Sequence, residues 1–170
     1  MNATLAAWNA ACATEARNAM LSCCGAKRWA DAMVALRPIA NVFALSEEAD
    51  RAWGTMQEAD WLEAFACHPP IGERKVSAHA SEQSSAWSRA EQAQTSLASE
   101  NVLAEIADGN QRYKELFGFT YIVCATGKSA EEMLAILKRR LGSTRESELR
   151  QAAEQQRQIL QIRLGKWLIE

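Results

Sequence analysis

The sequence has few of the residues that break helices, and it has no long apolar run. Its 170 residues include three prolines, none of them after Pro70, and eight glycines that all occur singly. No window approaches the run of about 18 apolar residues that a membrane-spanning helix needs. The chain also does not open with a cationic segment followed by an apolar run, which is the form of a secretory signal. These absences favour helices joined by short turns and a protein that does not cross a membrane.

An excess of charge of either sign is missing as well. The chain has 19 Lys and Arg against 21 Asp and Glu, for a net charge of -2, and this balance offers no basic field for nucleic acid or anionic lipid. Its five cysteines are an odd number and form no CxxC pair, which argues against a secreted disulfide framework. We therefore expect a soluble, cytoplasmic protein that binds neither nucleic acid nor membrane.

Alanine and straight-chain residues dominate the sequence, and they are strong helix formers. Because 170 residues suit one domain, we predict that residues 1–170 form a single-domain, all-α bundle of about seven to nine helices. Capping residues, glycine stops and apolar spacing predict its main helices. These helices are expected at 14–24, 27–37, 46–56, 58–66, 99–118, 129–142 and from Thr144 almost to the end. Thr14 is predicted to cap the first of them, and Ser129 is predicted to open the helix at 129–142 with a capping box that includes Glu132. In the helix at 99–118, Leu116 and Phe117 are both expected to point inward.

Two segments do not fit this helical pattern. Residues 71–86 are polar and show no apolar period, so we predict a long exposed loop, a feature that is often functional. Residues 119–125 are the one strand-like run, but no pairing partner is evident. This run is predicted to be a short strand, extended chain or the start of a buried helix.

His68 lies on an elbow that follows the helix predicted at 58–66. The stretch Cys67-His68-Pro69-Pro70-Ile71-Gly72 holds one of two histidines and two of three prolines. Proline fixes its own backbone and moves the preceding residue out of the helical region, so the backbone holds the His68 imidazole rigidly. Alternatively, His68 simply ends the helix, where the helix dipole favours a cation.

Two charged residues later in the chain strengthen the functional interpretation of His68. Ser88-Arg89-Ala90-Glu91 has the form of a capping box, which predicts a helix start and gives Glu91 a structural alternative. The last predicted helix has an inward stripe of residues spaced three and four apart: Leu149, Ala153, Gln156, Leu160, Arg163 and Trp167. An arginine buried in this stripe requires an anionic partner. That partner is either a ligand or an internal glutamate, unless the side chain reaches solvent near the helix end.

Taken together, these stretches resemble the 2-oxo-4-hydroxy-4-carboxy-5-ureidoimidazoline (OHCU) decarboxylase family of urate breakdown. The resemblance rests on the order and spacing of four motifs and covers almost the whole chain. The motifs are HPxIG at 68–72, SxxEQ at 88–92, FGFxxxVCA at 117–125, and Arg163-Leu164.

The resemblance implies an all-helical homodimer that converts OHCU to (S)-allantoin and carbon dioxide without a metal or an organic cofactor. It implies that His68, Glu91 and Arg163 are the catalytic residues. It also implies substrate contacts, partly through backbone groups, from Pro69, Ser88, Gln92, Tyr121, Ile122, Val123, Cys124 and Ala125. The absence of a cofactor is chemically reasonable, because the electrons released by decarboxylation can flow into a C=N bond of the substrate itself.

Three alternatives remain open at this point. Ser81-Glu82-Gln83 also contains a Glu-Gln pair, but the residue three positions before Glu82 is His79 and supplies no hydroxyl, so we prefer Glu91. The protein could instead be a helical module that binds a ureide or purine without turnover. A metal-dependent hydrolase using Cys67, His68 and His79 ranks last, because adjacent residues rarely ligate one tetrahedral ion.

Overall fold

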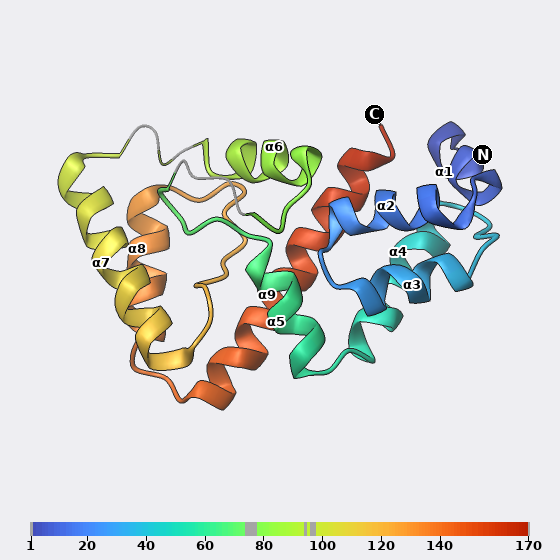
Figure 1. Ribbon diagram of the computed structural model, residues 1–170. Helices are drawn as coiled ribbons and strands as arrows, with labels where there is room; N and C mark the ends of the chain where they lie inside the picture. Colours follow the sequence, from blue (N-terminus) through green and yellow to red (C-terminus); the bar gives the residue numbers. More distant parts are fainter. Residues whose placement is uncertain (1, 74–77, 94, 96–97, 170) are drawn as a thin grey trace. The chain divides into compact units, whose positions relative to one another are not determined.

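The computed structural model describes residues 2–73, 78–93, 95 and 98–169 of the chain. Within these residues the fold is all-α, as predicted, and contains no strand (Figure 1). The described residues form nine helices: α1 (Ala3–Ala10), α2 (Ala13–Cys23), α3 (Lys27–Ala35), α4 (Val42–Gly54), α5 (Glu58–Ala66), α6 (Glu82–Glu91), α7 (Glu100–Phe117), α8 (Ala130–Arg140) and α9 (Arg145–Trp167). None of these helices is long and apolar enough to span a bilayer.

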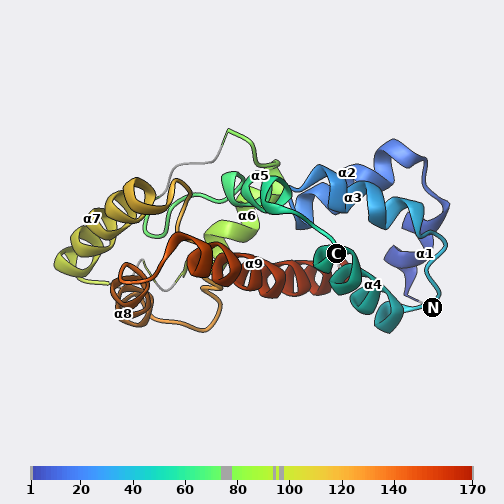
Figure 2. The same cartoon turned by 90° about the horizontal axis from the view of Figure 1, so that it is seen from below.

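The chain divides into two compact units, and the division falls within α5 and within α9. The first unit runs up to Ala64 and resumes at Arg157. In it, α2 and α3 lie side by side (Figures 1 and 2). Two buried tryptophans anchor its core, because the Trp8 indole donates to the Ala16 carbonyl at 2.9 Å and the Trp29 indole donates to the Ala49 carbonyl at 3.1 Å.

The second unit, Phe65–Gln156, contains α6, α7, α8 and the first part of α9. Helices α7 and α8 lie side by side, and the connecting chain runs from the end of α7 back to the start of α8 (Figure 1). A cluster of aromatic rings with centroids 4.6–6.3 Å apart fills the core of this unit: Phe65, Tyr113, Phe117, Phe119 and Tyr121. Whether the two units make a single domain stays a prediction.

Helix α4 begins four residues before the predicted start at Ser46. Asn41 caps it, because its side chain accepts a hydrogen bond from the Ala44 N–H at 2.9 Å. Ser46 therefore lies inside the helix, where its hydroxyl donates to the Gln161 side-chain oxygen at 2.8 Å. The acidic pair after Ser46 looked like a first turn, but asparagine is an equally good cap and begins the helix earlier.

Two smaller predictions were also wrong. Thr14 does not cap α2, because that helix begins at Ala13 after Cys12, whose side chain makes no capping hydrogen bond. Leu116 was expected to point inward from α7, but it is 56% exposed. The neighbouring Phe117, which was also expected to point inward, is buried, so the apolar period predicted only one of these two residues correctly.

Gly109 allows α7 and α8 to approach closely. A Cβ atom at this position would lie 2.6 Å from Leu137 Cδ2 and 3.1 Å from Leu137 Cγ, and Leu137 is completely buried. We expect Gly109→Ala to destabilise the protein by about 1–2 kcal/mol, because the overpacking outweighs the higher helix propensity of alanine. Urea unfolding measures this change in the free energy of unfolding.

Gly165 provides the matched control for this substitution. It lies inside α9, and nothing is within 4 Å of the position its Cβ would take. Gly165→Ala is therefore expected to stabilise the protein by about 0.5–1 kcal/mol through helix propensity alone. Equal stabilisation by both substitutions would contradict the close packing at Gly109.

Candidate active site

The His68 corner forms as the sequence predicts. Helix α5 ends at Ala66, and the His68 N–H still donates to the Phe65 carbonyl at 3.1 Å. His68 is half-buried, as are the two prolines after it. The imidazole is therefore attached to backbone that proline restricts, just beyond a helix terminus.

A tight turn follows the prolines and is fixed at two points. The Glu73 N–H donates to the Pro70 carbonyl at 3.2 Å, and Gly72 has φ +82°, which a type II turn requires at its third residue. The Ile71 carbonyl accepts from the Asn110 side chain of α7 at 2.9 Å. The Gly72 N–H donates to the Gln92 side-chain oxygen at 3.0 Å.

Glu91 closes a helix and does not open one, so the predicted capping box at residues 88–91 is wrong. Helix α6 already begins at Glu82, with Ser81 as its cap and the Ser84 N–H donating to the Ser81 hydroxyl at 3.1 Å. The predicted loop at 71–86 is correspondingly shorter, and its residues 74–77 lie outside the described part of the chain. The sequence did not predict this helix start, because the serines of α6 give no apolar period.

The observed bounds of α6 still place Ser88, Glu91 and Gln92 on one face. Glu91 and Gln92 follow Ser88 by three and four residues, a spacing that places all three side chains on the same side of a helix. Ser88 is buried, while Glu91 and Gln92 are half-buried. Gln92 joins this face to the His68 corner through its bond to Gly72. The structure thus brings two predicted motifs, HPxIG and SxxEQ, together.

The alternative carboxylate lies at the other end of the same helix. Glu82 occupies the first turn of α6 and is exposed, and nine residues of helix correspond to about 13 Å along the axis. The Gly72–Gln92 bond lies next to Glu91. This arrangement favours Glu91 over Glu82 as the carboxylate beside the corner that holds His68.

Residues 121–125 form neither a helix nor a strand, so the extended-chain alternative applies. All five residues are at least 95% buried. The Ile122 carbonyl accepts from Arg140 at 2.6 Å, the Cys124 N–H donates to the Gln155 side chain at 2.9 Å, and the Cys124 carbonyl accepts from the Lys128 ammonium at 2.8 Å. Side chains from outside the segment therefore fix its backbone.

A buried charged network supports this segment, and sequence reasoning missed it. Arg140 donates from Nε to Glu148 Oε2 at 2.8 Å and from its second terminal nitrogen to the Tyr113 hydroxyl at 3.1 Å. Both members of the ion pair are at most 1% exposed. Arg140 continues the apolar row Met133 and Leu137 at spacings of four and three, and this periodicity was the signal that could have identified it.

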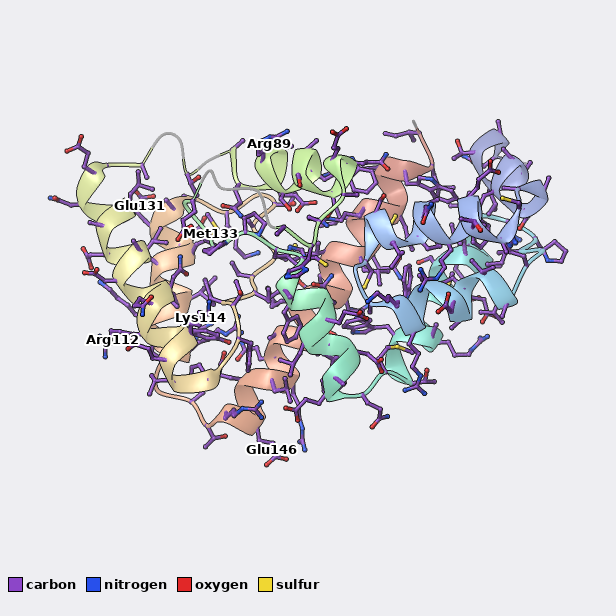
Figure 3. All side chains as sticks on the ribbon, viewed as in Figure 1. Arg89, Arg112, Lys114, Glu131, Met133 and Glu146 are labelled. Atoms are coloured by element: carbon purple, nitrogen blue, oxygen red, sulfur yellow. The ribbon has the colours of Figure 1, made fainter. Side chains whose placement is uncertain are left out.

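The tyrosines of the network keep their protons. Burial raises the pKa of the Tyr113 phenol far above its usual range, with the Glu148 carboxylate acting in the same direction and the Arg140 charge opposing it. The Tyr113 hydroxyl therefore donates to Glu148 Oε2, at 2.6 Å. Burial likewise raises the pKa of Tyr121, whose hydroxyl donates to the Met133 carbonyl at 3.1 Å. Met133 lies on α8 (Figure 3).

Arg163 points inward from α9, as its periodicity predicts. The complete predicted stripe is buried: Leu149, Ala153, Gln156, Leu160, Arg163 and Trp167. Arg163 is only 1% exposed, and it belongs to the unit that resumes at Arg157, whereas His68 and Glu91 belong to Phe65–Gln156. The convergence of the three residues stays a prediction.

Among the described residues, no group of three or more His, Cys, Asp or Glu side chains could hold a metal ion. The thiol of Cys67, one of the three candidate ligands, donates to the carbonyl of His79, another candidate, at 3.5 Å. This contact uses the backbone of His79 and not its imidazole.

Known proteins are similar to this chain in sequence and in fold. The model of the OHCU decarboxylase family matches residues 9–165. The uric acid degradation bifunctional protein TTL of Arabidopsis thaliana is 34% identical over 152 residues, which span 85% of this chain and 44% of that protein. The 2-oxo-4-hydroxy-4-carboxy-5-ureidoimidazoline decarboxylase of Amia calva is 32% identical over 134 residues, 75% of this chain and 73% of its own.

The fold matches solved structures as well. A crystal structure of OHCU decarboxylase in the presence of (S)-allantoin aligns with a TM-score of 0.76 and 31% identity, over 88% of this chain and 96% of that one. A crystal structure of (S)-allantoin synthase aligns with a TM-score of 0.71 over 96% of this chain and 53% of its own. At 18% identity, this second likeness concerns the fold alone.

Proposed function

Because this chain belongs to the OHCU decarboxylase family, we propose that it converts OHCU to (S)-allantoin and carbon dioxide in urate breakdown. The observation that carries this proposal is the hydrogen bond between the Gly72 N–H and Gln92. It joins the corner that holds His68 to the helix end that holds Glu91. An imidazole and a carboxylate attached to one rigid framework suit proton transfer to and from a small substrate.

The substrate supplies the electron sink for this reaction. The carbon that loses carbon dioxide bears a hydroxyl and adjoins a ring carbon double-bonded to nitrogen. When the carbon–carboxylate bond breaks, its electron pair forms a C=C bond to the ring carbon that bears the ureido group, and the electrons of the C=N bond move to the nitrogen, which takes a proton. The resulting enol then loses its hydroxyl proton to become the ring carbonyl, and the carbon bearing the ureido group takes a proton on one face. The protein therefore needs no cofactor, and its tasks are orientation, proton transfer and stereocontrol.

The three proposed catalytic residues take different parts of this work. His68 exchanges a proton with the substrate hydroxyl or the developing nitrogen anion, and Glu91 orients the imidazole or favours its charged form. Arg163 holds the departing carboxylate or a ureido oxygen with its planar fork of donors. The burial of Arg163 supports this role, because a buried guanidinium binds an anion far more strongly than an exposed one.

Proposed substrate contacts come from two places in Phe65–Gln156. Pro69, Ser88 and Gln92 belong to the corner and to the face of α6 beside it. In the 121–125 segment, the bonds described above engage the backbone of Ile122 and Cys124. The backbone of Tyr121 and of Val123 makes no hydrogen bond within the described residues. Buried amide groups of this kind suit a flat, amide-rich ligand.

We also propose that the protein acts in the cytoplasm as a homodimer. The family resemblance supports the dimer, and five free cysteines, four of them buried, suit a reducing compartment. Light scattering in solution is expected to give twice the chain mass of 18.8 kDa.

Freshly generated OHCU provides the test of the reaction. It absorbs in the near ultraviolet and decays slowly without a catalyst. Added protein is expected to accelerate this decay in proportion to its concentration, and heat-unfolded protein is expected to have no effect. Binding of OHCU with no acceleration would indicate instead a helical module that binds ureides without turnover.

A further inference from the structure

Arg140 and Lys128 contact the 121–125 segment but belong to none of the motifs that identify the family. We infer that both are positioning residues for the reaction, because they hold the carbonyls of Ile122 and Cys124 and thereby fix the backbone presented to the substrate. This inference rests on the proposed function and deepens it. It assigns no proton transfer and no substrate contact to either side chain.

Arg140 binds this backbone with a side chain that is itself held in place by other contacts. Its three nitrogens donate to three different acceptors. Nε donates to the Glu148 carboxylate at 2.8 Å, and one terminal nitrogen donates to the Ile122 carbonyl at 2.6 Å. The other terminal nitrogen donates to the Tyr113 hydroxyl at 3.1 Å. Its guanidinium carbon also lies 5.0 Å from the centroid of the Tyr121 ring. Only a guanidinium has donors in a fixed planar arrangement that satisfies three acceptors at once.

Stability alone does not account for this network. A buried ion pair is often no more stabilising than apolar side chains of similar volume. Here the second carboxylate oxygen of Glu148 is buried and has no hydrogen-bond partner among the described residues, which adds a further cost. What the pair does provide is a rigid donor aimed at one backbone carbonyl of the substrate-binding segment.

Lys128 follows the 121–125 segment in the sequence and binds a second carbonyl of it, that of Cys124. Its ammonium donates to the Cys124 carbonyl at 2.8 Å, and its own N–H donates to the Ala125 carbonyl at 3.0 Å. With Ile122 and Cys124 held in this way, Val123 lies between two fixed residues. A shift of the segment by about 1 Å is enough to misplace the substrate and to lower kcat/KM by up to about a hundredfold.

The test compares two substitutions with matched controls. Arg140→Lys keeps the charge beside Glu148 but loses the planar set of guanidinium donors. Its control is Leu137→Ala, which removes buried packing one turn earlier on α8, at a residue whose side chain makes no hydrogen bond to the segment. Lys128→Met removes the ammonium, and its control is the same change at Lys138, whose partner is Glu105 on the surface. Each variant is assayed with OHCU below its measured Tm.

We expect Arg140→Lys and Lys128→Met to raise KM roughly tenfold or more and to lower the enantiomeric excess of the allantoin product, because a misplaced backbone no longer orients the substrate. The controls are expected to keep the wild-type KM and handedness even where Leu137→Ala loses as much Tm as Arg140→Lys. Lys128→Met decides the outcome if Arg140→Lys does not fold, because Lys128 is only half-buried.

Two results separate failure of this inference from failure of the proposed function. If the wild-type protein accelerates OHCU decay and both substitutions leave KM and handedness unchanged, the positioning role is wrong. If the wild-type protein itself does not accelerate the decay, the decarboxylase proposal fails, and the positioning role fails with it.

Discussion

His68→Asn is expected to lower kcat/KM for OHCU by about a thousandfold or more, because asparagine keeps a polar side chain at the corner but cannot exchange a proton near neutral pH. The helical circular dichroism spectrum should be unchanged. His68 is half-buried and lies after the end of α5, so the substitution interrupts no helix. Steady-state kinetics of OHCU decay measures the effect.

His79 is the matched control for this substitution. It is the only other histidine of the chain, and it is exposed. We expect His79→Asn to retain wild-type activity. Equal losses in the two variants, or an active His68→Asn protein, would remove His68 from the mechanism.

Glu91→Gln is expected to lower kcat/KM by about a hundredfold to ten-thousandfold, because the amide retains the shape of the carboxylate but not its charge or basicity. Glu82→Gln is the control within the same helix. Glu82 occupies the first turn of α6, at the opposite end from the Gly72–Gln92 bond, and its substitution should have little effect. An inactive Glu82→Gln protein beside an active Glu91→Gln protein would move the catalytic carboxylate to the start of α6.

The sequence predicted the fold wherever apolar residues followed a helical period. The inward stripe of α9 is buried throughout, and Arg163 was predicted to be inward from that period alone. The capping box at Ser129 is also confirmed, with the Glu132 N–H donating to the Ser129 hydroxyl at 3.2 Å and Glu132 accepting from the Ser129 N–H at 2.7 Å. Local signals sufficed in these places because local interactions determine the structure.

Sequence reasoning failed where polar residues form the helix or where the partners lie far apart in the chain. Helix α6 begins at Glu82 and has Trp87 as its one large buried apolar side chain. The sequence therefore shows no apolar period there, and Glu91 was placed at the wrong end of a helix. The contact between Gly72 and Gln92 spans 20 residues. No local pattern encodes such a contact, although the family resemblance implied that the two motifs belong to one site.

The buried network is the clearest example of this limit. Arg140 and Glu148 are eight residues apart, on different helices, and each has the side chain of an ordinary surface residue. Only the folded chain joins them to Tyr113 and to the carbonyl of Ile122. The periodicity of α8 could have shown that Arg140 is buried, but not which carbonyl it holds.

The most direct test of the central claim is the handedness of the product when OHCU is generated from urate in the presence of this protein. Circular dichroism follows allantoin as it forms. We predict (S)-allantoin in excess, appearing faster than OHCU decays without a catalyst. Racemic allantoin formed at the spontaneous rate would contradict the account.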